Sequence, residues 1–125
     1  MGVTALQPIE NVRLDRDQLQ VLYRQLGPVG ADKVLNHALE ELASLLVEVP
    51  ADYRAGRFDR VQAGARALAA VAQQVGMITL ARVARDAAAL ALGYDGAAFG
   101  AVVARLERIG DRSLVAVWDM GDPPG

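Results

Sequence analysis

Few side chains in this chain can do chemistry. It contains a single histidine, His37, and no cysteine, which excludes cysteine nucleophiles, disulfides and thiolate metal sites. Ser44 and Ser113 both fall within helical patterns, and no glycine-rich phosphate loop or ligand-spaced carboxylate–histidine cluster is present. We therefore predict that the protein is not an enzyme and that it holds neither a metal nor a cofactor.

His37 is the one residue suited to proton or phosphoryl chemistry near neutral pH. At about 100° per residue, it lies roughly 140° from Leu42, the centre of the apolar face of its helix. This angle predicts an exposed side chain, neither buried nor a ligand. The plain interpretation is a solvated surface residue, and the functional alternatives are a phosphoacceptor or a pH-sensing contact.

The amino-acid composition limits which secondary-structure elements can position these residues. The 125 residues form one domain. Of these residues 53% are hydrophobic but only 5% are aromatic, and this balance favours packed helices over a sheet. The net charge is −2 and no run of like charge exceeds two residues, so the usual electrostatic footprint of nucleic-acid binding is absent. The chain start lacks the pattern of a secretory signal, and no apolar run reaches the length of a membrane span. We expect a cytoplasmic protein that contacts neither nucleic acid nor membrane.

Apolar residues recur at helical spacing in five stretches: 15–26, 31–50, 61–76, 80–93 and 95–117. Asp15 and Asp95 are suited to cap the first and the last, and Gly27-Pro28 is a stop signal. Pro50 either ends or kinks the second helix, with Gly56 as its latest end.

Short connections make successive helices antiparallel neighbours. The prediction is an all-α, up-down antiparallel four-helix bundle with an additional short N-terminal helix. Residues 1–13 would form a flexible arm, 14–120 the bundle, and 121–125 a disordered tail.

The third helical stretch has an unusual outward face, because alanines separate its few polar side chains. Small residues around one projecting arginine leave the backbone approachable, as a docking surface requires. The plain alternative is that alanine is simply the best helix former. We predict that the partner-docking residues are Gln62, Ala63, Arg66, Ala67, Ala69, Ala70 and Gln73.

The order of particular residues along the chain resembles that of a known family. Around the third helical stretch these residues are Gly56, Val61, Ala65, Leu68, Ala72 and Gly76. Towards the end of the chain they are Arg105, Leu106, Ser113, Leu114 and Trp118. Over residues 12–118 this order resembles the histidine-containing phosphotransfer (HPt) domain of bacterial phosphorelays. The resemblance implies a four-helix bundle of HPt type and a role in two-component signalling.

The chain departs from the family at its signature, which is a histidine, any residue, then Leu-Lys-Gly, with a glycine six positions later. Arg66 stands at the histidine position and Leu68 at the leucine, while Ala69 and Ala70 replace the lysine and the first glycine. Arginine stays protonated and is no nucleophile. The resemblance therefore implies a degenerate member in which Arg66 marks a pseudo-phosphoacceptor position that does not relay phosphate.

His37 is a poor substitute at that position. Counting back from the hairpin between the second and third helices places Arg66 beside about Leu42, so His37 lies roughly 7 Å further along the axis. We predict that the two residues occupy different sites.

An HPt-like domain without its histidine is still able to bind. The family docks receiver domains of response regulators, and meets kinases, through an apolar patch around the histidine. Arg66 would then project towards the receiver's acidic phosphorylation pocket and pair with a carboxylate or an aspartyl phosphate. The predicted partner is thus a receiver domain or a sensor kinase. Two alternatives stay open: a helical dimerisation module that forms a homodimer, or a phosphotransfer protein that uses His37.

Overall fold

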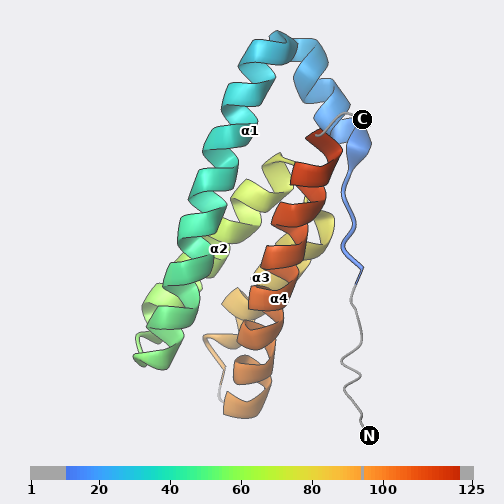
Figure 1. The fold of residues 1–125 in the computed structure, drawn as a ribbon. Helices are drawn as coiled ribbons and strands as arrows, with labels where there is room; N and C mark the ends of the chain where they lie inside the picture. The colour runs from blue at the N-terminus through green and yellow to red at the C-terminus, as the bar shows by residue number, and fades with distance from the viewer. Residues whose placement is uncertain (1–10, 94, 122–125) are drawn as a thin grey trace, which may run out of the picture.

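The computed structural model describes residues 11–93 and 95–121, and this part of the chain is all-α (Figure 1). Its helices are α1 (Arg16–Arg54), α2 (Phe58–Gln74), α3 (Ile78–Leu90) and α4 (Gly96–Gly121). Each helix contacts the next along the chain, and α4 also contacts α1, so the four helices surround one core. This arrangement is that of an up-down four-helix bundle, as predicted.

The first helix is longer than the sequence pattern suggested. Asp15 caps it, because its Oδ1 accepts a hydrogen bond from the Gln18 amide at 3.1 Å. Gly27 has φ 74° and ψ 169°, and the chain changes direction sharply there, at the top of Figure 1. A separate short N-terminal helix is not shown: residues 16–26 are the first part of α1, and the bend divides it. The physical reason lies in Pro28, because proline fits the first turn of a helix and helical structure resumes immediately.

The bend in α1 is braced by a side-chain hydrogen bond. The Tyr23 hydroxyl, before the bend, donates to Asp32 Oδ1, after it, at 2.5 Å. That bond to the carboxylate, helped by partial burial and the nearby negative charge, raises the pKa of Tyr23 above its usual value. Pro50 neither ends nor breaks the helix: Gly27 is the only residue of α1 with a non-helical backbone, and α1 continues to Arg54.

The core contains the apolar stripes that the periodicity predicts. Every member of the α2 stripe is fully buried: Val61, Ala65, Leu68, Ala72 and Val75. Asp95 caps α4 as expected, because its Oδ1 accepts from the Ala98 amide at 3.0 Å. Abundant alanine lets the helices approach closely, which compensates for the small number of aromatic side chains.

Two glycines mark the closest helix contacts. A Cβ on Gly64 would lie 2.6 Å from Val49 Cγ2, so α2 meets α1 there. A Cβ on Gly110 would lie 2.5 Å from Leu46 Cδ2, where α4 meets α1. An interior glycine such as Gly110 weakens an isolated helix by about 1 kcal/mol. In the bundle, however, it is what allows the contact with Leu46.

The chain preceding α1 is fastened to the turn between α2 and α3. Leu14 and Met77 form an isolated antiparallel β-bridge. The Asp15 amide donates to the Gly76 carbonyl at 2.7 Å, and Gly76 itself has φ 78°. A Cβ on Gly76 would lie 2.8 Å from the Asp15 carbonyl oxygen, so this position requires glycine.

Arg13 takes part in the same attachment. Its carbonyl accepts from the Ile78 amide at 3.0 Å, and its own amide donates to Thr79 Oγ1 at 2.8 Å. Arg13 is the last residue of the arm predicted over 1–13, and these two bonds hold it at the turn. Residues 1–10 of that arm, and 122–125 of the predicted tail, lie outside the described residues.

Candidate docking groove

A shallow groove of about 380 Å³ runs along the outside of the bundle between α2 and α3. We call it the α2–α3 groove. Residues from α2, from α3 and from the segment after α3 line it: Gln62, Arg66, Ala69, Arg85, Ala88, Ala89 and Leu92. Three of the predicted docking residues, Gln62, Arg66 and Ala69, therefore lie in one concave surface.

The floor of the groove is made of alanine methyl groups. Ala69 and Ala88 are only 7% and 8% exposed, one from each helix. The sequence predicts Ala69 on the outward face of its helix, but its methyl group lies at the bottom of the groove. Of the other predicted docking residues, Ala63 and Ala70 are exposed and Ala67 is half-buried. A partner would reach Ala69 only with a group that enters the groove.

Arg66 is exposed at the rim of the groove and makes no hydrogen bond or ion pair with any described residue. A guanidinium carries five N–H donors in a planar fork that matches a carboxylate or phosphoryl group. Arg66 therefore leaves its hydrogen-bonding capacity available to a ligand.

Arg85, on α3, lines the same groove as Arg66 and was not singled out from the sequence. Its Nη1 donates to Gln73 Oε1 at 3.1 Å, which connects α3 back to α2. The sequence did contain a signal that Arg85 lies at the level of Arg66, because Arg66 lies ten residues before Gly76 and Arg85 nine residues after it. In an antiparallel helix pair that turns at Gly76, such positions meet.

Two glutamines hold the walls of the groove. Gln62 Nε2 donates to the Ala88 carbonyl at 3.4 Å, across the groove from α2 to α3. Gln73 holds Arg85 with its side chain, and its carbonyl accepts from Gln18 Nε2 at 2.7 Å. Gln73, one of the predicted docking residues, is therefore connected to the groove by its hydrogen bond to the Arg85 side chain.

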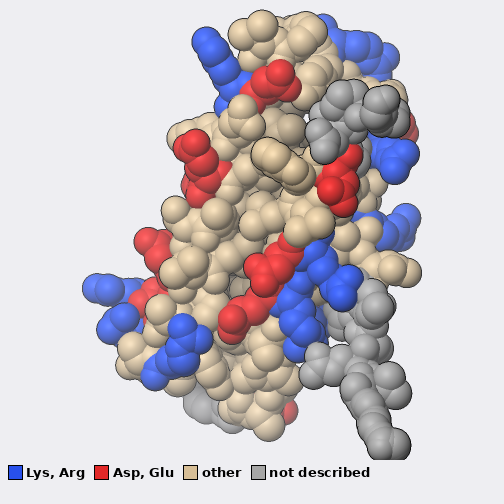
Figure 2. Space-filling view, viewed as in Figure 1, with Lys and Arg blue, Asp and Glu red and all other residues tan. Residues whose placement is uncertain are grey.

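The charged side chains that line the α2–α3 groove are all positive. Its lining contains two arginines and no carboxylate, although the chain as a whole has a net charge of −2. The face formed by α1 and α4 is different: Figure 2 shows acidic and basic residues interspersed over it. The α2–α3 groove thus offers a positive site on a nearly neutral protein.

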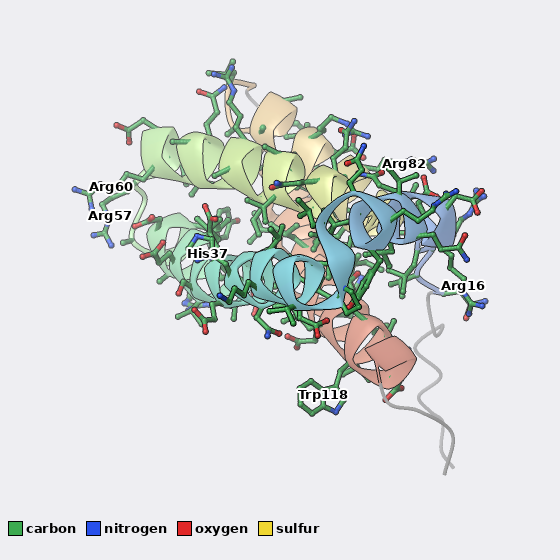
Figure 3. All side chains as sticks on the ribbon, turned by 90° about the horizontal axis from the view of Figure 1, so that it is seen from above. Arg16, His37, Arg57, Arg60, Arg82 and Trp118 are labelled. Atoms are coloured by element: carbon green, nitrogen blue, oxygen red, sulfur yellow. The ribbon has the colours of Figure 1, made fainter. Side chains whose placement is uncertain are left out.

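His37 lies in a second hollow, on the other side of α2, which we call the α1–α2 groove. It is about 330 Å³ in volume and is lined by Lys33, Val34, His37, Ala38, Glu41 and Gln74. His37 is exposed, as the helical wheel predicts, and Figure 3 shows it on the side of α1 that faces α2. Lysine and glutamate both line this hollow, so its formal charge is balanced.

The register of α1 on α2 differs from the one counted along the sequence. Gly64 meets Val49, and His37 shares its groove with Gln74, so Arg66 falls opposite residues 45–47 rather than beside Leu42. The axial distance between His37 and the level of Arg66 is then roughly 12–15 Å, about twice the predicted value. The hairpin turn is tighter than assumed, because α1 continues to Arg54 and α2 begins at Phe58.

In the described part of the chain, no three histidine, cysteine or acidic side chains come together as metal ligands would. None of its helices is both long and apolar enough to cross a bilayer. Comparisons of the chain with protein-family models, with curated proteins and with solved structures found no match. Any functional assignment therefore depends on the residues and geometry of the protein itself.

Proposed function

We propose that this protein is an HPt-like component of two-component signalling that binds a receiver domain or a sensor kinase without relaying phosphate. In this proposal the bundle is of HPt type, and residues 16–26 correspond to a short N-terminal helix before the Gly27 bend. One observation carries the proposal. Arg66, at the position of the family's histidine, is exposed beside a groove whose lining contains no carboxylate.

Loss of relay follows from the chemistry of arginine. A phosphorelay needs a neutral imidazole nitrogen to attack phosphorus and later release the phosphoryl group. Arginine remains protonated and has no free lone pair for that attack. His37 does not replace it, because it lies on the other side of α2, with Glu41 among the residues around it.

Binding remains open to such a protein. A receiver domain presents acidic side chains around its phosphorylated aspartate, and a guanidinium pairs with such groups in a bidentate manner. The alanine floor leaves room for a partner's side chains to enter between α2 and α3. The expected complex places Arg66 at the centre of the interface, where a charge pair is shielded from water and counts most.

The test is a calorimetric titration of the protein against a panel of purified receiver domains and kinase dimerisation domains. We expect saturable binding to one or two of them. Arg66→Glu should weaken that binding by about 2 kcal/mol or more, roughly thirtyfold, because it reverses a buried charge contact. Arg60→Glu is the matched control: it changes the same residue type on the same helix, and Figure 3 shows Arg60 at the α1–α2 hairpin end.

No binding across the panel, or equal weakening by both variants, would contradict the proposal. A second function then becomes the leading one, a homodimerising helical module. The observation in its favour is an apolar pair on α4, because Trp118 is 72% and Val115 58% exposed. Figure 3 shows Trp118 pointing away from the bundle. Sedimentation equilibrium of the wild type and of Trp118→Ala distinguishes the two functions, since only a dimer through α4 would dissociate on this change.

A further inference from the structure

We infer that Arg66 and Arg85 together form a binding site for a phosphoryl group presented by the partner. The protein would then recognise the phosphorylated state of that partner rather than merely its fold. The identity of the partner rests on the proposed function, whereas the chemistry of the site rests on the groove alone. The two are therefore open to separate tests.

Charge is the first argument. The seven lining residues contain two arginines and no acidic group, so the groove carries a formal charge of +2. A phosphoryl group carries about −1.5 to −2 at neutral pH, whereas a carboxylate carries −1. Two guanidinium groups therefore match a phosphoryl group, and a single carboxylate would leave one of them uncompensated.

Other hollows of the described surface have both signs of charge in their lining, and one of them, at the α2–α3 turn, is lined by Arg85 itself together with Asp15. The α1–α2 groove combines Lys33 with Glu41. A hollow along α4 has two arginines and two aspartates in its lining, namely Arg108, Arg112, Asp111 and Asp119. In both, the charges on the protein already compensate one another, so neither favours a doubly charged anion.

Geometry is the second argument. Gln73 holds Arg85 through a single N–H of Nη1, which leaves four of its five donors for a ligand. Arg66 uses none of its donors on described residues. Arg85 is thus held at the end of the groove nearer the α2–α3 turn, and Arg66 has no described partner that would keep it from moving towards a ligand. The two come from different helices, so a phosphoryl group lying between them would be held from both sides.

Space is the third argument. The floor of the groove contains the methyl groups of Ala69 and Ala88. The Gln62 side chain reaches across one end of it to the Ala88 carbonyl, so the open part of the floor is the part around Ala69. A phosphoryl group and the side chain that bears it fit within the 380 Å³ that the groove provides.

The site is tested first without any partner. Phenyl phosphate and benzoate are titrated into the full chain at constant ionic strength, with NMR of the arginine Nε–Hε signals. We expect saturable shifts of the Arg66 and Arg85 signals with phenyl phosphate, and at least tenfold weaker binding of benzoate. Arg66→Gln and Arg85→Gln should each abolish the shifts of the remaining arginine. Arg108→Gln, an exposed arginine of α4, is the matched control and should change nothing.

The second arm uses a receiver domain identified by the panel, with and without beryllofluoride as the phosphoryl mimic. We expect at least tenfold tighter binding of the beryllofluoride form, and a ratio near one for Arg66→Gln and Arg85→Gln. Gln73→Leu, which removes the tether of Arg85 but neither arginine, should lower the ratio by an intermediate amount. The amide spectra of each variant report whether it is folded.

The outcomes separate the two claims. Equal binding of phenyl phosphate and benzoate, or shifts that do not saturate, would overturn this inference even if a receiver binds. Saturable binding of phenyl phosphate that depends on both arginines, with no receiver bound, would support the site and overturn the proposed partner.

Discussion

The two grooves beside α2 differ in how their charges are arranged. The α2–α3 groove presents Arg66 and Arg85 over an alanine floor with no acidic neighbour in its lining. The α1–α2 groove contains the only histidine, but it places that histidine between Lys33 and Glu41, one helical turn to either side. In this protein the reactive residue type and the positively charged groove occupy different surfaces, so the location of the histidine does not coincide with the proposed binding site.

The helix contacts behind the two grooves differ as well. On the α1 side, α2 meets its neighbour through Gly64, where even a single methyl group would collide with Val49. On the α3 side, α2 offers Ala69, whose methyl group has open space above it. Side-chain enlargement should therefore disturb the fold on one side of α2 and the binding surface on the other.

The largest effect is expected for Gly64→Val. The added branches would push α2 away from α1, and overpacking of this kind costs about 2–3 kcal/mol of unfolding free energy. Urea denaturation followed by circular dichroism measures it. Ala63→Val, the exposed neighbouring position, should cost only about 0.5 kcal/mol through helix propensity. Similar values for both variants would show that the close contact at Gly64 is not needed.

Ala69→Leu should show the opposite behaviour. Its larger side chain extends into the open groove, so unfolding free energy should stay within about 1 kcal/mol of the wild type. Binding of the receiver or of phenyl phosphate should weaken by at least about tenfold, or about 1.4 kcal/mol, because the floor is filled. Ala104→Leu, at an exposed position of α4 away from the groove, is the control. If ligand affinity survives Ala69→Leu, the ligand does not enter the groove.

Tyr23→Phe tests the α1 side of the molecule, and its expected effect on stability is smaller than that of Gly64→Val. Loss of the hydrogen bond to Asp32 should cost less than about 1 kcal/mol, because the bond is exposed to solvent. The raised pKa of Tyr23 means that the folded state holds the phenolic proton more tightly than the unfolded chain. The stabilisation is therefore present below pH about 10, the unfolded pKa, and is lost as pH rises through the folded pKa.

Denaturation curves at pH 8 and above pH 10 measure this difference between the wild type and Tyr23→Phe. The two proteins should converge in stability at the higher pH. The NMR signals of Lys33 and His37, which follow the bend, should move in Tyr23→Phe, whereas those of Arg66 should stay in place. A difference in unfolding free energy between the two proteins that widens with pH would contradict the assigned hydrogen bond.

The smallest effect is expected for His37→Gln. Receiver affinity should change less than about twofold, or about 0.4 kcal/mol, because His37 lies outside the α2–α3 groove. Incubation with a phosphorylated receiver should leave no acid-labile phosphate on either the wild type or the variant. Acid-labile phosphate that appears on the wild type and disappears in His37→Gln would establish the histidine as a relocated phosphoacceptor and remove the contrast between the grooves.

Periodicity was enough to predict the helices and their buried faces. Val61, Leu68 and Val75 recur at steps of seven, and all three are fully buried. Caps were equally readable, because Asp15 and Asp95 each accept a backbone amide as expected. These features depend on residues close together in the chain, so sequence patterns describe them well.

Features that depend on the distance between helices were harder to predict. A helical wheel places Ala69 on the outward side of α2, but only the approach of α3 determines that its methyl group becomes a floor. Arg85 was missed because its interest comes from lining the same groove as Arg66 from a different helix. The Gly27-Pro28 pair correctly indicated an interruption, but the local signal does not distinguish a bend within a helix from a break between two helices.

The attachment of residues 13–15 to the α2–α3 turn has a consequence for the order of folding. The bond from the Arg13 amide to Thr79 Oγ1 joins positions separated by 66 residues. Closing so long a loop from an open chain has a larger entropic cost than forming a helical hairpin, so the hairpins of α1 with α2 and of α2 with α3 precede it. Within this attachment the Arg13–Thr79 bond is exposed to solvent, whereas Leu14 packs against the core and Met77 is fully buried, so the bond of Arg13 is the first part to open. In native-state hydrogen exchange the amide of Arg13 should therefore lose protection before those of Asp15 and Ile78, so the attachment opens from its exposed end.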